Sequence, residues 1–288
     1  MAIESLHALE KASENRDIFE VILDSDCTDR GVSREASLEK MHALYAAIRR
    51  AREGYDPALR SASGMVGGDG AKMREYVQKG KTICGDYIGQ VIAQALEMGE
   101  SNACMKCIVA APTAGSCGVL PAVLLPYQAR EGLDDDAMVR AMYIAGAIGQ
   151  VVAAKASIAG AAGGCQAEIG TASAMGAAAL CYLGGGSAQA VCHAAAIAIK
   201  SMLGLVCDPI AGLVEVPCVK RNAAGAMIAM SSADMALAGI RSAVPPDEVI
   251  LAMREVGDKM DVSLKETGVG GVAGTPFGQK IAEKMGVL

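Results

Sequence analysis

Apolar residues recur every three to four positions along most of this chain, which is the spacing of a helix that buries one face. Leu38, Met41, Tyr45 and Ile48 give a clear example. The spacing predicts helices within residues 1–53, near residue 72, and over 82–98 (with Gly99 as the stop), 138–159, 222–240 and 246–260. The one β-like run, residues 213–216, is too short to form a sheet.

Residues 169–199 contain no Asp, Glu, Lys or Arg, and this length exceeds the roughly 20 residues that a membrane span needs. The segment is mostly Ala, Gly and Ser, however, with few of the Leu, Ile and Phe residues that are typical of a span. Gly184, Gly185 and Gly186 interrupt it. We interpret the segment as two buried helices joined by a glycine turn and expect no membrane contact.

Loops rich in small residues separate the predicted helices. They cover residues 61–70, 109–118, 160–164 and 207–218, and the C-terminal tail is also rich in glycine. The sequence shows no internal repeat, no long linker and no strand–glycine–helix unit of the dinucleotide-binding type. We therefore predict an all-α fold with a single helical domain, residues 1–288, on which the N-terminal helices of residues 1–58 pack.

Composition supports closely packed helices and argues against nucleic-acid binding. Apolar residues make up 52% of the chain, but aromatic residues only 3%, with no Trp, so the core must be built from small aliphatic residues and Met. Charged residues are 20% and the net charge is −6. A mildly acidic chain without basic clusters or aromatic platforms is a poor ligand for nucleic acid.

The chain contains ten cysteines, and charged residues run through its first twenty positions, so we expect no secretory signal. We therefore expect a cytoplasmic protein, and disulfides are rare in that reducing compartment. The cysteines are then core thiols or metal ligands. Cys84, Cys181 and Cys192 lie in predicted helices and are expected in the core.

Three other cysteines lie at breaks between predicted helices. Cys165 follows two glycines, Cys207 precedes an Asp-Pro pair and Cys218 follows a proline. A thiol at such a break can project into a cavity. Their spacing matches no zinc motif, and the single C-x-x-C pair, Cys104 and Cys107, lacks a second pair. The residues alone leave open whether the three are structural thiols or ligands.

Longer motifs around these cysteines resemble the iron–sulfur-dependent L-serine dehydratases, specifically their catalytic α chain. The motifs are APTAGSCG (residues 111–118) followed by PAV, GGCQAE (163–168), CDPIAG (207–212), VPC (216–218) and RNA (221–223). GGDGAK (67–72) and KET (265–267) with two following glycines also fit. The similarity covers residues 60–275, and the order of these long motifs makes it specific.

The resemblance implies that Cys165, Cys207 and Cys218 hold a [4Fe–4S] cluster on which the small-residue loops converge. Three ligands leave one of four irons open, as catalytic metal sites require. That iron would act as a Lewis acid on the hydroxyl of L-serine, and loss of the α-proton and of hydroxide would lead to pyruvate and ammonia. The resemblance implies no pyridoxal phosphate, and no lysine lies in a loop suited to it.

Five residues near the motif cysteines are candidates for substrate binding. Thr113, Gly115 and Ser116 form a small-residue turn whose backbone N–H groups could cradle a carboxylate, although a helix cap would use the same residue types. Gln166 and Glu168 flank Cys165 and could orient the substrate or the cluster ligands.

The general base is not identified by the sequence. Of the three histidines, His193 is expected to pack in the core, and His7 and His42 are expected to be exposed. Members of the family carry a Ser-Ser-Ser-His-Thr motif in a separate domain or β chain, and this sequence lacks that motif. The resemblance therefore implies a partner β chain that completes the site, in a hetero- or homo-oligomer. Single-chain relatives end in a cysteine, whereas this sequence ends in Leu288.

Three alternatives stay open at this point. The chain could be an iron–sulfur lyase of another β-substituted amino acid, such as an L-cysteine desulfidase or an L-threonine dehydratase, because a methyl group or a thiol changes only pocket contacts. It could be a non-catalytic helical protein that binds a cluster as a sensor or scaffold. It could also be a helical protein whose thiols are purely structural.

Overall fold

The computed structural model describes residues 3–287, and within them it contains only helices, turns and loops, with no strand. In this part of the chain the α-helices are α1 (Leu6–Ala12), α2 (Ile18–Arg30), α3 (Arg34–Glu53), α4 (Asp69–Gln78), α5 (Gly85–Ala103), α6 (Val119–Glu131), α7 (Asp135–Lys155), α8 (Gly160–Gly163), α9 (Thr171–Leu183), α10 (Ala188–Met202), α11 (Cys218–Leu237), α12 (Pro246–Lys259) and α13 (Pro276–Lys284). The predicted all-α fold is confirmed.

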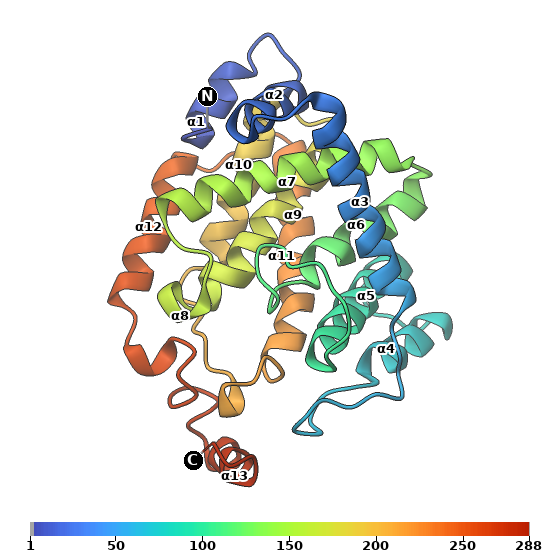
Figure 1. Ribbon diagram of the computed structural model, residues 1–288, viewed down its shortest axis with the longest axis vertical. Coiled ribbons are helices and arrows are strands. Elements are labelled where there is room, and N and C mark those ends of the chain that lie inside the picture. Colours follow the sequence, from blue (N-terminus) through green and yellow to red (C-terminus); the bar gives the residue numbers. More distant parts are fainter. Residues whose placement is uncertain (1–2, 288) are drawn as a thin grey trace.

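Helix α9 forms the centre of the molecule and is surrounded by α6, α7, α10 and α11 (Figure 1). Every residue from Thr171 to Cys181 is buried, so this helix has no solvent-exposed face over three turns. Its small side chains let the neighbouring helices approach closely. A Cβ atom added at Gly176 would lie 3.2 Å from the Cβ of Ala229 on α11. The charge-free segment is therefore a core helix, joined by a glycine turn to α10.

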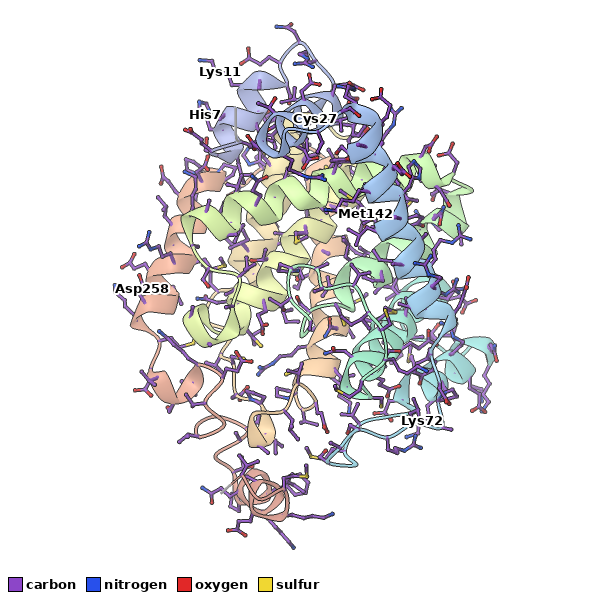
Figure 2. All side chains as sticks on the ribbon, viewed as in Figure 1. His7, Lys11, Cys27, Lys72, Met142 and Asp258 are labelled. Atoms are coloured by element: carbon purple, nitrogen blue, oxygen red, sulfur yellow. The ribbon has the colours of Figure 1, made fainter. Side chains whose placement is uncertain are left out.

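The N-terminal helices cover one end of this core. Helices α2 and α3 pack on α7, and α1 packs on α10 and α12. Leu6, Phe19 and Tyr45 are the large side chains that they bury. Side chains cap their first turns, since Asp17 accepts a hydrogen bond from the N–H of Phe19 and Ser33 accepts one from Ala36. The polar faces point outward, as Lys11 shows at the periphery in Figure 2.

Several predicted boundaries were wrong, and packing explains one of them. Helix α5 runs through Gly99 to Ala103, because Gly99 allows close contact with α11. A Cβ at Gly99 would lie 3.2 Å from the Cα of Val219. Helix α7 ends at Lys155 instead of residue 159, where Ala156 leaves the helical conformation. Helix α13 was not predicted at all.

Two further expectations, on cysteine burial and on a membrane span, can be compared with the structure. Cys181 and Cys192 are fully buried, as predicted, whereas Cys84 is exposed at the turn before α5. Among the described residues, α7 is the helix that is long and apolar enough to cross a membrane, and 67% of its most apolar stretch is buried inside the protein. Length and hydropathy alone therefore give weak evidence for a span.

Candidate functional site: three cysteine loops

The motif cysteines lie in three segments, next to α8, after α10 and at the start of α11, and these segments lie in the lower half of the molecule as drawn in Figure 1. Cys165 immediately precedes a π-helical turn, η1 (Gln166–Gly170), which leads into α9. Cys207 lies in the loop after α10, and Cys218 is the first residue of α11. All three thiols are buried. A π-helical turn is rare and is frequent at functional sites.

The ligand atoms of Cys165, Cys207 and Glu168 all lie within 4.8 Å of one another. The thiols of Cys165 and Cys207 are hydrogen-bonded to each other. Cys218 lies outside this tight group but near it. Its pKa is raised chiefly by burial, and the charges of Cys165 and Glu168 act in the same direction. Ligands of a multi-iron cluster bind at different corners and need not touch, so the position of Cys218 outside the tight group is compatible with such a cluster.

Gln166 ties two of these loops together. Its Nε2 donates to the carbonyl oxygen of Met253 at 3.0 Å, and its Oε1 accepts from the N–H of Gly204 at 2.9 Å. Its backbone N–H donates to the carbonyl oxygen of Leu205 at 2.9 Å. The side chain is fully buried, so the structure gives Gln166 a scaffolding role. A direct contact of Gln166 with substrate stays a prediction.

The C-terminal tail is attached to the loop of Cys207. The backbone N–H of Cys207 donates to the carbonyl oxygen of Leu264 at 2.8 Å, and the N–H of Glu266 donates to the carbonyl oxygen of Cys207 at 2.6 Å. These bonds form a parallel bridge between Cys207 and Lys265. Next in the chain, Asp208 accepts a hydrogen bond from the N–H of Val272 at 2.7 Å. The tail is therefore part of the site.

Arg221 supplies a positive charge to the site. Its guanidinium donates to the sulfur of Cys165 at 3.5 Å and to the carbonyl oxygen of Val206 at 2.8 Å, and it forms an ion pair with Asp208 at 2.9 Å. The side chains of Arg221 and Asp208 are only 17% and 3% exposed. Sequence reasoning quoted Arg221 in a motif but gave it no role. The signal available was its position three residues after Cys218, at the start of a helix.

The thiols titrate differently because their surroundings differ. The hydrogen bond from Cys207 lowers the pKa of Cys165, and Arg221 acts in the same direction. The same bond and burial raise the pKa of Cys207. Burial raises the pKa of Cys218 to about 12. Cys165 is therefore the most acidic thiol of the three, and the other two would release protons on binding a metal.

The small-residue turn lies against Glu168. The hydroxyl of Thr113 donates to Oε1 of Glu168 at 2.8 Å, and a Cβ at Gly115 would lie 3.5 Å from the same oxygen. Ser116 is buried, and its hydroxyl accepts from the N–H of Thr113 at 3.3 Å, so it shapes the turn from within. Burial raises the pKa of Glu168. Thr113, Gly115 and Glu168 thus share one wall of the site.

Because Gly160 has no side chain, a small space remains that Cys207, Glu168 and Glu266 border. A Cβ atom at Gly160 would lie 2.7 Å from the sulfur of Cys207, 2.8 Å from Oε2 of Glu168 and 3.2 Å from Oε2 of Glu266. Any side chain there would collide with all three groups. The thiol of Cys207 borders this space, and that of Cys165 lies within 4.8 Å of the Cys207 thiol, so with Cys218 at the start of α11 the donor set fits an iron–sulfur cluster.

No histidine of the described chain is bonded within this site. His193 is half-buried on α10, where its Nδ1 accepts from the N–H of Ser242 at 3.2 Å. His42 is 42% exposed and contacts Asp136, so it is less open than predicted. His7 lies on α1, at the end of the molecule opposite the C-terminal tail (Figure 2).

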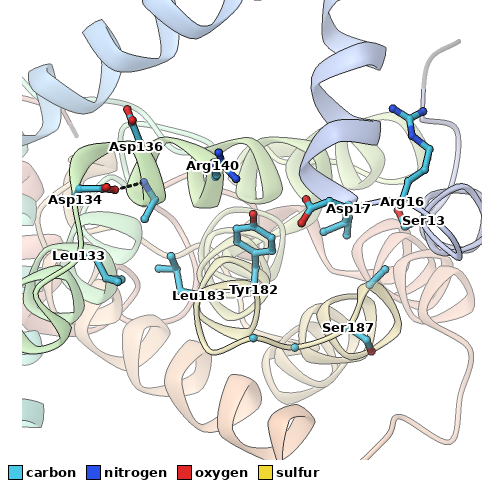
Figure 3. A pocket seen from close by; sticks show the side chains of 15 residues that line it. Ser13, Arg16, Asp17, Leu133, Asp134, Asp136, Arg140, Tyr182, Leu183 and Ser187 are labelled. Atoms are coloured by element: carbon cyan, nitrogen blue, oxygen red, sulfur yellow. Dashed lines mark hydrogen bonds between the residues drawn. The ribbon is translucent and has the colours of Figure 1, made fainter.

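A wide surface cavity lies elsewhere in the molecule. It has a volume of about 760 Å³ and lies between the N-terminal helices and the turn that joins α9 to α10. Tyr182, Arg140 and Asp17 line it, as Figure 3 shows. None of the motif cysteines borders it. Because it is a wide surface hollow among charged side chains, it does not define the reactive site.

Comparisons with known proteins indicate the same family as the motifs around the cysteines. The family described as "Serine dehydratase alpha chain" matches residues 7–273. The probable L-serine dehydratase α chain of Bacillus subtilis is 49% identical over 85% of this chain and 80% of its own length. The L-serine dehydratase α chain of Peptoniphilus asaccharolyticus is 43% identical over 92% and 91%.

Longer relatives match over a smaller share of their length. L-serine dehydratase 1 of Escherichia coli is 45% identical over 62% of this chain and 40% of its own length. The matched family spans almost all of the described residues, including the three cysteine loops and the tail up to residue 273. The chain is therefore a member of the serine dehydratase alpha-chain family.

Proposed function

We propose that this chain is the catalytic α chain of an iron–sulfur L-serine ammonia-lyase, which converts L-serine to pyruvate and ammonia. The convergence of Cys165, Cys207 and Glu168 within 4.8 Å, at motifs of a serine dehydratase family, is the observation that carries the proposal. The small-residue turn and a buried arginine surround the same point.

Cys165, Cys207 and Cys218 would hold the [4Fe–4S] cluster. When bound, it would supply a Lewis-acid iron that makes the β-hydroxyl of serine a better leaving group. The protein's part is to keep the thiols in fixed positions, and Gln166 does this for the loops of Cys165 and Cys207 through its bonds to the neighbouring backbone. No pyridoxal phosphate is part of this proposal.

The turn of Thr113, Gly115 and Ser116 would receive the carboxylate of serine through backbone N–H groups. Ser116 fixes the shape of the turn, and Thr113 fixes the carboxylate of Glu168 beside it. Glu168 would then orient the substrate. Because its oxygens lie against the turn, one bound molecule of serine can contact both.

A β chain would complete the site and provide the base. The α chains named above are matched over 80–91% of their length, whereas the E. coli relative, named simply L-serine dehydratase, is matched over 40%. A whole enzyme of that name is therefore much longer than this chain. Since no histidine is bonded within the described site, the proton acceptor is assigned to the partner, in a hetero-oligomer of the cytoplasm.

The first test is the iron and acid-labile sulfide content of protein purified without oxygen. We expect both to be present, and to be lost in Cys165→Ser, Cys207→Ser and Cys218→Ser. Cys84→Ser is the matched control, because Cys84 is exposed at the start of α5 and belongs to none of the three cysteine loops. Colourless wild-type protein without iron would contradict the proposal.

The second test is activity with the β-type partner. Pyruvate release from L-serine is expected, and it should decline during storage in air because an iron without a protein ligand is easily lost. Dominant release of 2-oxobutyrate from L-threonine, or of sulfide from L-cysteine, would favour the related lyases. A brown protein that is inactive with its partner on all three amino acids would favour the sensor or scaffold function.

A further inference from the structure

Glu266 reaches the site from the C-terminal tail. Its backbone has φ = +62°, a left-handed conformation that costs energy for a residue with a side chain. The N–H of Glu266 donates to the carbonyl oxygen of Cys207 at 2.6 Å, which anchors this conformation directly beside a cysteine of the site. The tail is thus shaped so that the carboxylate, and not only the backbone, turns toward the cysteines.

The carboxylates of Glu266 and Glu168 face the same small space. Oε2 of Glu266 lies 3.2 Å, and Oε2 of Glu168 2.8 Å, from the point that a Cβ of Gly160 would occupy. Glu168 accepts a hydrogen bond from Thr113. In the described chain the carboxylate of Glu266 forms neither a hydrogen bond nor an ion pair, although the residue is half-buried.

The charges around this space do not balance. Arg221 is the cation that bonds at the site, and it is already paired with Asp208 and bonded to Cys165. Two carboxylates therefore face one small space, and like charges that border the same space are unfavourable unless a cation joins them. The irons of a bound cluster would compensate the charge of the cysteine sulfurs. The carboxylate pair still lacks a positive partner.

Serine carries one such partner, its α-ammonium group. If the turn of Thr113 and Gly115 receives the carboxylate of serine, the ammonium group of the same molecule lies within reach of Glu168, which borders that turn. An ammonium group has three donors, enough to bond both carboxylates at once. A bond to a charged group is also among the stronger hydrogen bonds.

We propose that Glu266 is a specificity-determining residue that, together with Glu168, binds the α-ammonium group of the substrate. This inference rests on the proposed function. Asp208 holds the tail in place for it, because Asp208 accepts from the N–H of Val272 and the backbone of Gly271 lies directly against it. A Cβ at Gly271 would be 2.3 Å from Oδ2 of Asp208.

The test compares two ligands of the anaerobic holoenzyme, with its β-type partner, that differ in one group. L-Serine has the ammonium group, whereas 3-hydroxypropionate keeps the carboxylate and the hydroxyl and lacks it. In Glu266→Gln we expect the KM for L-serine to rise by roughly tenfold to a hundredfold, as loss of a bond between charged groups implies. The inhibition constant of 3-hydroxypropionate should not change, and Glu266→Asp should restore part of the affinity.

Glu283→Gln on α13 is the matched control, since Glu283 is exposed on the same tail. The electron paramagnetic resonance signal of the reduced cluster should be the same in wild type and Glu266→Gln. An unchanged KM would overturn the inference. So would a parallel rise of both constants or an altered cluster signal without substrate, because these point to an iron ligand or a structural role. Absence of serine turnover in the wild-type holoenzyme would instead overturn the proposed function itself.

Discussion

At the level of single residues, Arg221 connects the chemistry of the site to its structure. One guanidinium contacts the sulfur of Cys165, a proposed cluster ligand, as well as a loop carbonyl and a buried carboxylate. A planar group with several fixed donors can do this, whereas an ammonium group concentrates its donors at one point. Hydrogen bonds to ligand sulfurs and local charge are known to tune iron–sulfur clusters. Arg221 should therefore determine how firmly the cluster is held.

Replacement of Arg221 should weaken cluster retention. In Arg221→Gln we expect the visible absorbance of the anaerobic protein to bleach in air roughly tenfold faster or more, which is the usual scale for a partner of a metal ligand. Arg221→Lys keeps the charge and should recover only part of the effect. Arg254→Gln is the control, because Arg254 is exposed on α12. Equal bleaching rates for all three variants and wild type would show that the contact to Cys165 is incidental.

The sequence motifs predicted part of this site and missed the rest for a physical reason. Cys165, Cys207, Thr113 and Glu168 were named in advance and do converge. Glu266 was quoted in a motif without a role. Its contact with the site depends on a backbone bridge to Cys207, and a bridge between distant segments leaves no local pattern in a sequence.

At the level of helices, the predicted end of α5 was wrong because glycine has two possible roles in a helix. Gly99 could end a helix or allow two helices to touch, and the sequence alone does not distinguish these two roles. The structure chooses contact, between α5 and α11. Long periodic helices were found because their apolar spacing is set by one buried face. Helix α13 was missed because its nine residues include a glycine and give too few turns to show a period.

Two glycines on buried and exposed helix faces should respond oppositely to alanine. Gly225 on α11 lies under α6 and α9, where a Cβ would be 2.8 Å from Ile169 and 3.1 Å from Val119. Gly225→Ala should lower the free energy of unfolding by about 1–3 kcal/mol through overpacking. Gly146 on α7 is exposed, with no atom within 4 Å of a Cβ, so Gly146→Ala should raise it by about 0.5–1 kcal/mol.

Denaturant unfolding of the two variants and wild type measures both changes under the same conditions. The comparison is internal, because each variant adds one methyl group to a helix of similar length. A stabilised Gly225→Ala would mean that α6, α9 and α11 are packed less closely than the structure has them. A destabilised Gly146→Ala would mean that this face of α7 is covered in solution, for instance by another chain.

At the level of the whole molecule, the last helix supports a cysteine loop far from it in sequence. Ala282 of α13 is buried against Ile210 and Ala211, and Ile281 packs beside it. Both partners belong to the short helical turn η2 (Ile210–Gly212), between Cys207 and Cys218. The loop that carries two proposed cluster ligands therefore has α13 as its outer support, although no residue of α13 is a ligand.

Deletion of residues 276–288 should therefore reduce the iron content of anaerobic protein while all three cysteines and Glu266 remain. The deletion exposes apolar surface of Ile210 and Ala211 that α13 buries, which costs about 1–3 kcal/mol. This cost is enough to loosen the loop without unfolding the helical core. Deletion of residues 286–288 alone, which follow α13, is the control and should keep the iron. If the longer deletion retains iron, sulfide and resistance to air as well as the shorter one does, the loop holds its shape without α13. The ends of α10 and α11 would then be sufficient to position Cys207 and Cys218.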